Sequence, residues 1–257
     1  MTREPGKGDG FLYRAYQRRL RNQIEPLVKP RHIAMILDGN RRWAKLNALA
    51  SAGHGHRAGA AKMSEFLEWC DDLGVEVVTL YLLSNDNLTG REPAELGDLY
   101  EIIAELADGL SRRPGWRIRH VGDSSSLPTQ LVSVLHAAEA RSATNTKLHV
   151  NLAVGYGGRH ELIAAMRSIV EKHQGSLSEL AATLTPELIG DHLYTNGQPD
   201  PDLVIRTSGE QRLSDFMVWQ SAHSEFYFME ALGPDLREVD FLRAVRAFGL
   251  RDRRYGK

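Results

Sequence analysis

Short apolar runs that end in glycine-rich or polar turns constrain this sequence most. The clearest are 33–37 (IAMIL), 75–83 (VEVVTLYLL) and 148–154 (LHVNLAV), and further ones lie at 116–121, 203–205 and 225–228. Helical stripes of apolar residues, as in 96–110, separate them. Continuous apolar strands are typical of a parallel sheet buried on both faces. The alternation therefore predicts a single α/β domain with a central, mostly parallel sheet of about six strands flanked by helices.

Charge and composition exclude several classes of protein. The 257 residues carry 32 Lys plus Arg and 33 Asp plus Glu, a net charge of −1, which argues against a dedicated nucleic-acid binder. The single cysteine, Cys70, rules out an intramolecular disulfide and is typical of a reducing compartment. No run of about 18 apolar residues is present, so we expect a soluble, cytoplasmic protein.

The N-terminal 30 residues differ in pattern from the rest of the chain. Residues 1–10 are small, charged and glycine-rich, which is typical of a tail. In 11–25, Phe11, Leu12, Ala15, Tyr16 and Leu20 are spaced to share one helical face. That face could pack on the protein or lie on a membrane surface, so peripheral membrane association stays open. We therefore predict a tail and helix over 1–30 and one catalytic domain over 31–257.

Polar and glycine residues follow the predicted strands at the points where each strand ends. Ligands of open α/β sheets bind outside the carboxyl ends of the strands, so these residues are the candidate site. They are the segments 38–43, 84–87 with Arg91, 155–159 and 206–214.

The residue types at this edge are those that bind phosphate groups. Arg42, Arg206 and Arg212 offer guanidinium forks, and nearby glycines expose backbone N–H groups. The single carboxylate, Asp38, suits one Mg²⁺ ion shared with a diphosphate. Taken alone, the arginines could simply be solvated, and 38–40 could be an ordinary turn. Their joint placement at the strand ends favours a binding site. No P-loop or G-x-S-x-G motif is present, and no zinc spacing is found.

Five motifs together resemble one protein family. They are HIAMILDGNRRWA (32–44), GHRAGA (55–60), LYLLSNDN (80–87), LHVNLAVGYGGR (148–159) and PDLVIRTSGEQRLSDFMVWQSAHSEFYF (201–228). They resemble the cis-prenyltransferases, the undecaprenyl diphosphate synthase family, in the family's order. The resemblance implies Mg²⁺-dependent condensation of isopentenyl diphosphate with an allylic diphosphate to form a Z double bond. It also implies a homodimer and an apolar tunnel below the edge of the sheet.

The resemblance assigns a role to each matching residue. Asp38 and Asn87 are implied to be catalytic, Asn87 through proton removal, and Asp38 and Glu225 to be near the metal. Arg206, Arg212 and Ser214 are implied to bind isopentenyl diphosphate. The allylic diphosphate is implied to be cradled by Gly39, Asn40, Arg41 and Arg42, with His56 nearby. The remaining residues of the implied substrate site are Trp43, Ser84, Asn85, Asp86, Leu88 and Arg91.

Several positions depart from the family pattern. Arg41 replaces a glycine, Leu88 replaces an aromatic residue, and an extra residue precedes Arg91. Ser51 or Ala52 stands where the family has a phosphate-binding arginine. Gln211 stands where many members carry histidine.

Bulky residues at the predicted tunnel bear on product length. Leu82 and Val154, with Leu83 beside them, stand where long-chain members often have alanine. Large side chains there would shorten the tunnel, which predicts a product near C15. The alternatives are a long-chain (decaprenyl or undecaprenyl) synthase, a head-to-middle prenyl synthase and a non-catalytic partner subunit. A trans-type synthase is excluded because no DDxxD motif is present.

Overall fold

Six parallel strands form the centre of the protein. The structure is a computed structural model, which describes residues 10–251. All five strand pairs are parallel, and the order β3-β4-β2-β1-β5-β6 places β1 beside β2 and β5. The strands are β1 (His32–Ile36), β2 (Val77–Ser84), β3 (Trp116–Val121), β4 (Leu148–Tyr156), β5 (Leu203–Arg206) and β6 (Glu225–Phe228). The predicted sheet is confirmed.

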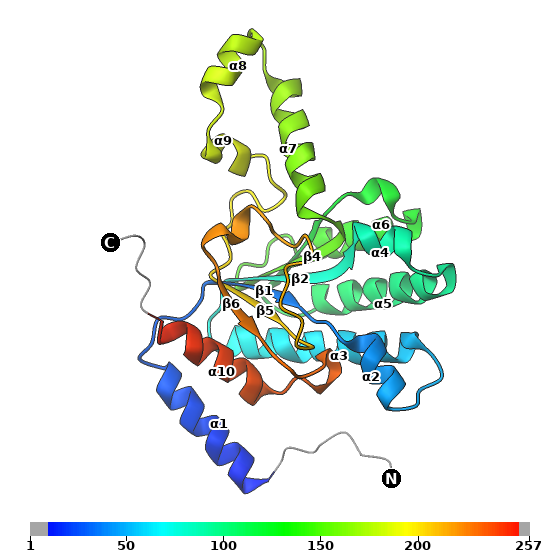
Figure 1. Ribbon diagram of the computed structural model, residues 1–257, viewed down its shortest axis with the longest axis vertical. Helices are drawn as coiled ribbons and strands as arrows, with labels where there is room; N and C mark the ends of the chain where they lie inside the picture. The colour runs from blue at the N-terminus through cyan, green and yellow to red at the C-terminus, as the bar shows by residue number, and fades with distance from the viewer. Residues whose placement is uncertain (1–9, 252–257) are drawn as a thin grey trace.

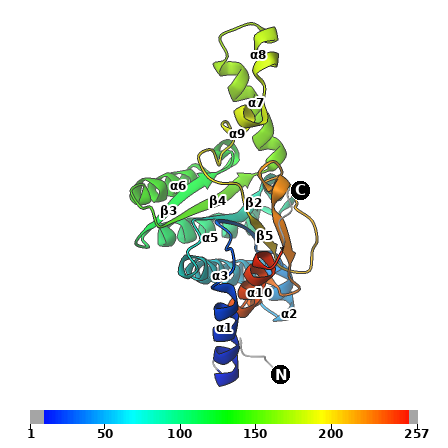
Figure 2. The same ribbon diagram turned by 90° about the vertical axis from the view of Figure 1, so that its left-hand side faces the viewer.

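Helices cover one face of the sheet, and an arm extends beyond the other (Figures 1 and 2). The covering helices are α3 (Ala52–Asp72), α5 (Pro93–Ser111) and α10 (Glu238–Gly249), while α1 (Phe11–Ile24) packs on α10 and α6 (Thr129–Ser142) lies at the β3 edge. The arm consists of α7 (Gly158–Lys172), α8 (Leu177–Thr183) and α9 (Pro186–Gly190). Short elements complete the chain: α2 (Asn40–Leu46), α4 (Asn85–Gly90) and the 3₁₀ turns at Ser124–Ser126, Gln220–His223 and Gly233–Asp235. No helix within 10–251 is long and apolar enough to cross a bilayer.

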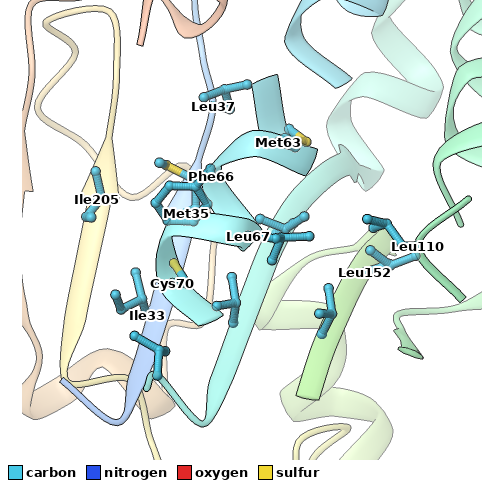
Figure 3. Packing of buried hydrophobic residues seen from close by; sticks show 14 of the residues in the cluster. Ile33, Met35, Leu37, Met63, Phe66, Leu67, Cys70, Leu110, Leu152 and Ile205 are labelled. Carbon is cyan, nitrogen blue, oxygen red and sulfur yellow. The ribbon is translucent and has the colours of Figure 1, made fainter. Parts of the chain in front are cut away.

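The main core lies between the sheet and α3. Phe66, Leu67 and Cys70 of α3 pack on Ile33 and Met35 of β1, and all five are fully buried (Figure 3). Burying one such large apolar side chain stabilises the fold by about 1.5–3 kcal/mol. The core therefore fixes β1, whose carboxyl end leads into the candidate site.

The free edge of the sheet at β3 is covered by α6. The Ser142 hydroxyl accepts a hydrogen bond from the Ile118 N–H (2.9 Å), and the Glu139 carboxylate accepts one from the His120 N–H (2.7 Å). These side chains occupy donors that an exposed edge strand would offer to another chain.

One helical face differs from the sequence prediction. In α1, Phe11 and Leu12 are 85% and 81% exposed, while Leu20 and Ile24 are buried. The helix packs against α10 through the face that carries Leu20, so the two most N-terminal apolar residues lie outside that contact. The apolar spacing in the sequence did not show which of these residues pack on the protein and which face solvent.

In α7, part of the apolar stripe is exposed. Ile163, Met166 and Val170 are each about half exposed, and the buried residues of the helix include Ala165 and Ile169. Because α7 projects away from the sheet, its apolar stripe has no partner among the described residues that would bury it.

Candidate active site

A cleft opens at the carboxyl ends of β1, β2 and β5. Its volume is about 450 Å³, within the range of small-molecule pockets. Its lining includes the predicted site residues Asp38, Gly39, Asn40, Arg41, Arg42, His56, Ser84, Asp86, Asn87, Arg91, Arg206, Arg212 and Ser214. Thus the strand-end rule brings residues from four separate segments to one place.

Asp38 is a carboxylate of the cleft that several hydrogen bonds hold in place. It follows β1, and Thr207 secures it: the Thr207 hydroxyl accepts from the Asp38 N–H (2.8 Å) and donates to the Asp38 carbonyl (2.7 Å). Arg206 donates to Asp38 Oδ2 at 2.7 Å. Burial alone would raise the pKa of Asp38, but hydrogen bonds from Arg206 and the Gly39 N–H hold it below its usual range. Asp38 is therefore ionised at neutral pH.

Gly39 allows the chain to turn directly after Asp38. Its φ is +96°, a left-handed conformation, and an added Cβ would lie 2.8 Å from the Leu232 side chain. This turn starts α2 at Asn40, whose side chain is wedged against Gly59 of α3 and Gly233. Asn40 therefore also serves as a packing residue between α2 and α3.

Arg206 organises the loop that carries the other predicted phosphate ligands. Its side chain is only 4% exposed, and one nitrogen donates to both the Arg212 carbonyl and the Ser214 hydroxyl (2.8 Å). Arg212 itself is exposed and pairs with Glu210, which also pairs with Arg42. The buried Arg206 thus links Asp38 to Ser214, while Arg42 and Arg212 present exposed guanidiniums to the cleft.

Glu95 of α5 contacts one histidine and two arginines, and it was missed from the sequence. His56 Nε2 lies 2.9 Å from Glu95 Oε1, Arg91 pairs with the same oxygen, and Arg41 lies 3.9 Å away. Burial opposes ionisation of Glu95, but His56, Arg91 and Arg41 hold its pKa below the usual range. Burial lowers the pKa of His56 more than Glu95 raises it, so His56 is neutral at pH 7. The only sequence signal for Glu95 as a site residue was its position in the first turn of α5, close after Arg91.

The segment after β2 forms the third wall. Ser84 caps α4 by accepting from the Asn87 N–H (3.1 Å), so the Asn87 side chain is held in the cleft lining. Tyr81 donates from its hydroxyl to the Ser214 carbonyl (3.1 Å). This contact joins the β2 wall to the Arg212 loop, and nothing in the strand-end rule identified Tyr81 beforehand.

The floor of the cleft is apolar. It is formed by Ile36, Leu37, Met63, Leu82 and Leu83. The β2–β4 register shifts around Leu82, which interrupts the simple alternation of side chains assumed from the sequence. Leu82 and Leu83 line the cleft, whereas Val154 is fully buried in the core behind it. The cleft has an apolar floor, but a longer tunnel is not shown.

Besides Val154, four predicted site residues lie outside the lining of the cleft. They are Trp43, Asn85, Leu88 and Glu225. The Trp43 indole donates to Asp235 (2.8 Å), and Leu88 packs against the core. Asn85 lies beside Gly157, at the start of α7.

Glu225 requires a correction to the predicted metal pair. It begins β6 and pairs with Leu203, at the amino end of β5, whereas Arg206 and Asp38 lie at the carboxyl end. Three residues of strand separate the two levels, about 10 Å. Glu225 instead forms an ion pair with Arg251. Within one chain, Glu225 and Asp38 therefore do not form a common site.

The residues of the cleft are compatible with one hard cation that arrives with its substrate. Among residues 10–251, no group of three His, Cys, Asp or Glu side chains is placed to hold a metal. Mg²⁺ commonly binds through one or two carboxylates plus substrate phosphates and water. The ionised Asp38 is such a carboxylate, and the surrounding arginines would hold the phosphates.

Together, the parallel sheet, the cation-ringed carboxylate and the apolar floor define a class of protein. This class consists of enzymes whose substrates have a phosphorylated head and an apolar body. Residues 36–256 match the family model described as "Putative undecaprenyl diphosphate synthase". The chain therefore belongs to the undecaprenyl diphosphate synthase family, the cis-prenyltransferases, and is an isoprenyl transferase.

Relatives and solved structures agree with this assignment. The chain is 53% identical to the "(2Z,6E)-farnesyl diphosphate synthase" of Thermobifida fusca, over 95% of this chain and 97% of that one. It is 46% identical to the "Short-chain Z-isoprenyl diphosphate synthase" of Mycobacterium bovis, over 96% of each. The crystal structure of lavandulyl diphosphate synthase from Lavandula x intermedia, with dimethylallyl diphosphate, matches at a TM-score of 0.83 and 33% identity, covering 89% of this chain and 99% of that one.

Proposed function

We propose that this enzyme condenses isopentenyl diphosphate with a short allylic diphosphate and releases a Z-isoprenyl diphosphate near C15. The observation that carries the proposal is the Asp38–Arg206 pair at the mouth of an apolar-floored cleft. Arg41, Arg42 and Arg212 surround this pair with cations. The names of the relatives in Thermobifida and Mycobacterium support the short product.

The residues of the chain divide the work of the reaction. Arg41, Arg42 and His56 face the position proposed for the allylic diphosphate, and Arg206, Arg212 and Ser214 face that of isopentenyl diphosphate. Holding both heads at one edge supplies the proximity that a bimolecular step lacks. Arginine guanidiniums stabilise the charge that develops on the departing diphosphate. Asn87 is proposed to assist removal of the proton from the condensed product.

Mg²⁺ is proposed to be held by Asp38 and by diphosphate oxygens. When bound, it would supply Lewis-acid stabilisation of the leaving diphosphate. Before binding, Arg206 occupies Asp38 Oδ2, and it keeps the carboxylate ionised and oriented. We propose no metal role for Glu225 within one chain.

Two alternatives in the family remain distinguishable by their products. The structural likeness to lavandulyl diphosphate synthase keeps the head-to-middle reaction as the second candidate. A long-chain product would require more room than the floor at Leu82 and Leu83 provides. The intact Asp38–Gly39–Asn40 turn argues against a non-catalytic subunit.

One assay tests the proposal. Labelled isopentenyl diphosphate is incubated with dimethylallyl, geranyl or farnesyl diphosphate and Mg²⁺, and product mass and double-bond geometry are measured. Asp38→Asn is expected to lower turnover by at least about 100-fold while the protein stays folded, and Asp191→Asn, on an exposed turn, should not. Irregularly linked products, products of decaprenyl length, or full activity of Asp38→Asn would each overturn it.

We also propose a homodimer and a peripheral contact with anionic membranes, in the cytoplasm. The exposed stripe of α7 supports the homodimer.

The outer face of α1 supports the membrane contact, because Phe11 and Leu12 are exposed beside Arg18 and Arg19, and α1 has no acidic residue. Arg18→Glu with Arg19→Glu should abolish co-sedimentation with phosphatidylglycerol vesicles. Absence of wild-type sedimentation would contradict the membrane contact.

A further inference from the structure

A second basic pocket lies apart from the active site, on β3 and β4. It is lined by residues of β3, β4, α6 and the loop 196–198, and its volume is about 640 Å³. Arg117 and Arg119 alternate with Ile118, so both side chains leave the same face of β3. His149 of β4 is the direct neighbour of Arg117 in the parallel register, and it adds an imidazole to that face.

No carboxylate of the described residues lies within ion-pair distance of the two arginines, and Glu139 acts on Arg119 only from farther away. Within residues 10–251, neither Arg117 nor Arg119 forms an ion pair. Arg119 is partly buried and donates to the Asn196 carbonyl at 3.2 Å. The only carboxylate in the lining, Glu139, already accepts the His120 N–H. Burial lowers the pKa of Arg119 more than Glu139 raises it, and Arg117 lowers it further.

The loop 196–198, which lines the pocket, is fixed to the sheet by side-chain hydrogen bonds. The Gln198 and Asn151 side chains donate to each other, at 2.6 Å and 3.1 Å. Asn151 is fully buried and also donates to the Thr79 hydroxyl (3.0 Å). The loop that carries Asn196 and Gln198 is therefore anchored to the sheet, so Arg119 is held in place rather than free in solvent.

We infer that this pocket binds a phosphoryl oxyanion between Arg117, Arg119 and His149. Guanidinium groups bind phosphate through paired, charge-assisted hydrogen bonds, and an anion would relieve the repulsion between two adjacent cations. Burial and the two arginines hold the pKa of His149 below its usual range, so the imidazole is neutral until an anion offsets these charges. The ligand class is phosphate or diphosphate, either free or as the head of a prenyl diphosphate.

The test uses the full chain and histidine ring NMR, with inorganic pyrophosphate as the probe. The His149 signal, assigned with His149→Gln, should shift saturably and its pKa should rise. In the Arg117→Gln/Arg119→Gln variant the affinity at His149 should fall at least about tenfold, as expected for a lost charge-assisted hydrogen bond. The control Arg112→Gln, on an exposed helix end, should behave as wild type. His56, in the active site, reports separately on the proposed function.

The outcomes separate the site from simple screening and from the active site. An unmoved His149 at about 10 mM pyrophosphate, or an equal shift in the double variant, overturns the inference whatever His56 does. An equal shift with sodium acetate at matched ionic strength also overturns it. Comparing pyrophosphate with geranyl diphosphate then shows whether the ligand is a free phosphate or the head of a prenyl diphosphate. Tighter binding of either one supports the site and shows whether the prenyl chain contributes.

Discussion

Among single residues, Leu82 has the clearest consequence for the product. It lines the floor of the cleft beside Leu83, whereas Leu80, two residues earlier on β2, is fully buried outside the cleft. Leu82→Ala should open room below the cleft and lengthen the product by one isoprene unit or more. Leu80→Ala should instead cost about 2–5 kcal/mol of stability and leave product length unchanged. Chromatography of the labelled products checks both, and an unchanged distribution in Leu82→Ala would contradict the chain-length role.

His32 titrates within a buried chain of side chains. The Nδ1–H donates to the Pro199 carbonyl (2.7 Å), and Nε2 accepts from the Thr79 hydroxyl (2.8 Å), because Thr79 is itself the acceptor for Asn151. Burial lowers the pKa of His32 to about 4. Its neutral form therefore contributes stability that is complete above the unfolded pKa of about 6.5 and is lost as pH falls towards 4.

This titration predicts a pH-dependent stability. Between pH 7 and pH 5, His32 should lower the free energy of unfolding by about 2 kcal/mol, because the unfolded chain binds the proton that the folded chain rejects. Urea unfolding at several pH values measures the slope. His32→Gln should flatten it, whereas His136→Gln, at an exposed position of α6, should not. Identical slopes for wild type and His32→Gln would show that His32 is not the responsible group.

At the scale of elements, the N-terminus of α7 holds the Arg212 loop. Asp215 accepts the Arg159 N–H through its side chain (3.1 Å) and the Gly158 N–H through its carbonyl (2.7 Å). Ser214 and Asp215 have φ of 52° and 62°, left-handed values that cost energy for residues other than glycine. The contact with α7 therefore keeps Ser214 in the position that Arg206 uses.

Removing the Asp215 side chain should weaken one substrate selectively. Asp215→Gly tolerates the positive φ but loses the helix cap, so the KM for isopentenyl diphosphate should rise roughly tenfold, with the allylic KM nearly unchanged. Asp215→Asn keeps an oxygen acceptor and should show a smaller rise. Steady-state kinetics with each substrate varied in turn measures the split. Equal changes in both KM values would indicate a general structural defect instead.

Prediction from sequence succeeded for the strands and partly failed for the helices. Buried parallel strands are recognised in the sequence as continuous apolar runs, and their carboxyl ends share one edge of the sheet. The positions of Asp38, Ser84 and Arg206 at this edge could therefore be predicted. Contacts between elements distant in sequence, such as Glu95 with His56, depend on helix packing that no local pattern encodes. The separation of Glu225 from Asp38 within one chain was not foreseen, because a motif gives the order of residues along the chain but not the level of each along its strand.

For the whole molecule, the α7 arm is the surface through which we expect two copies of the proposed homodimer to assemble. Ile163, Met166 and Val170 recur at helical spacing and are about half exposed on an arm that projects from the sheet (Figure 1). A twofold contact places the same stripe of each copy against the other, so every buried residue contributes twice. Burial of each such side chain stabilises the pair by up to about 1.5–3 kcal/mol.

Charges in this stripe should therefore separate the copies. Ile163→Glu with Met166→Glu should reduce the mass in light scattering from twice 28.7 kDa to a single chain at micromolar concentration. Lys172→Glu, on the exposed end of the same helix, should leave the dimer intact. Asp215 of the Arg212 loop accepts hydrogen bonds from the N-terminus of α7. The monomeric variant should therefore show a raised KM for isopentenyl diphosphate with unchanged circular dichroism. A wild-type monomer, or a dimer that survives both charges, would contradict assembly through α7.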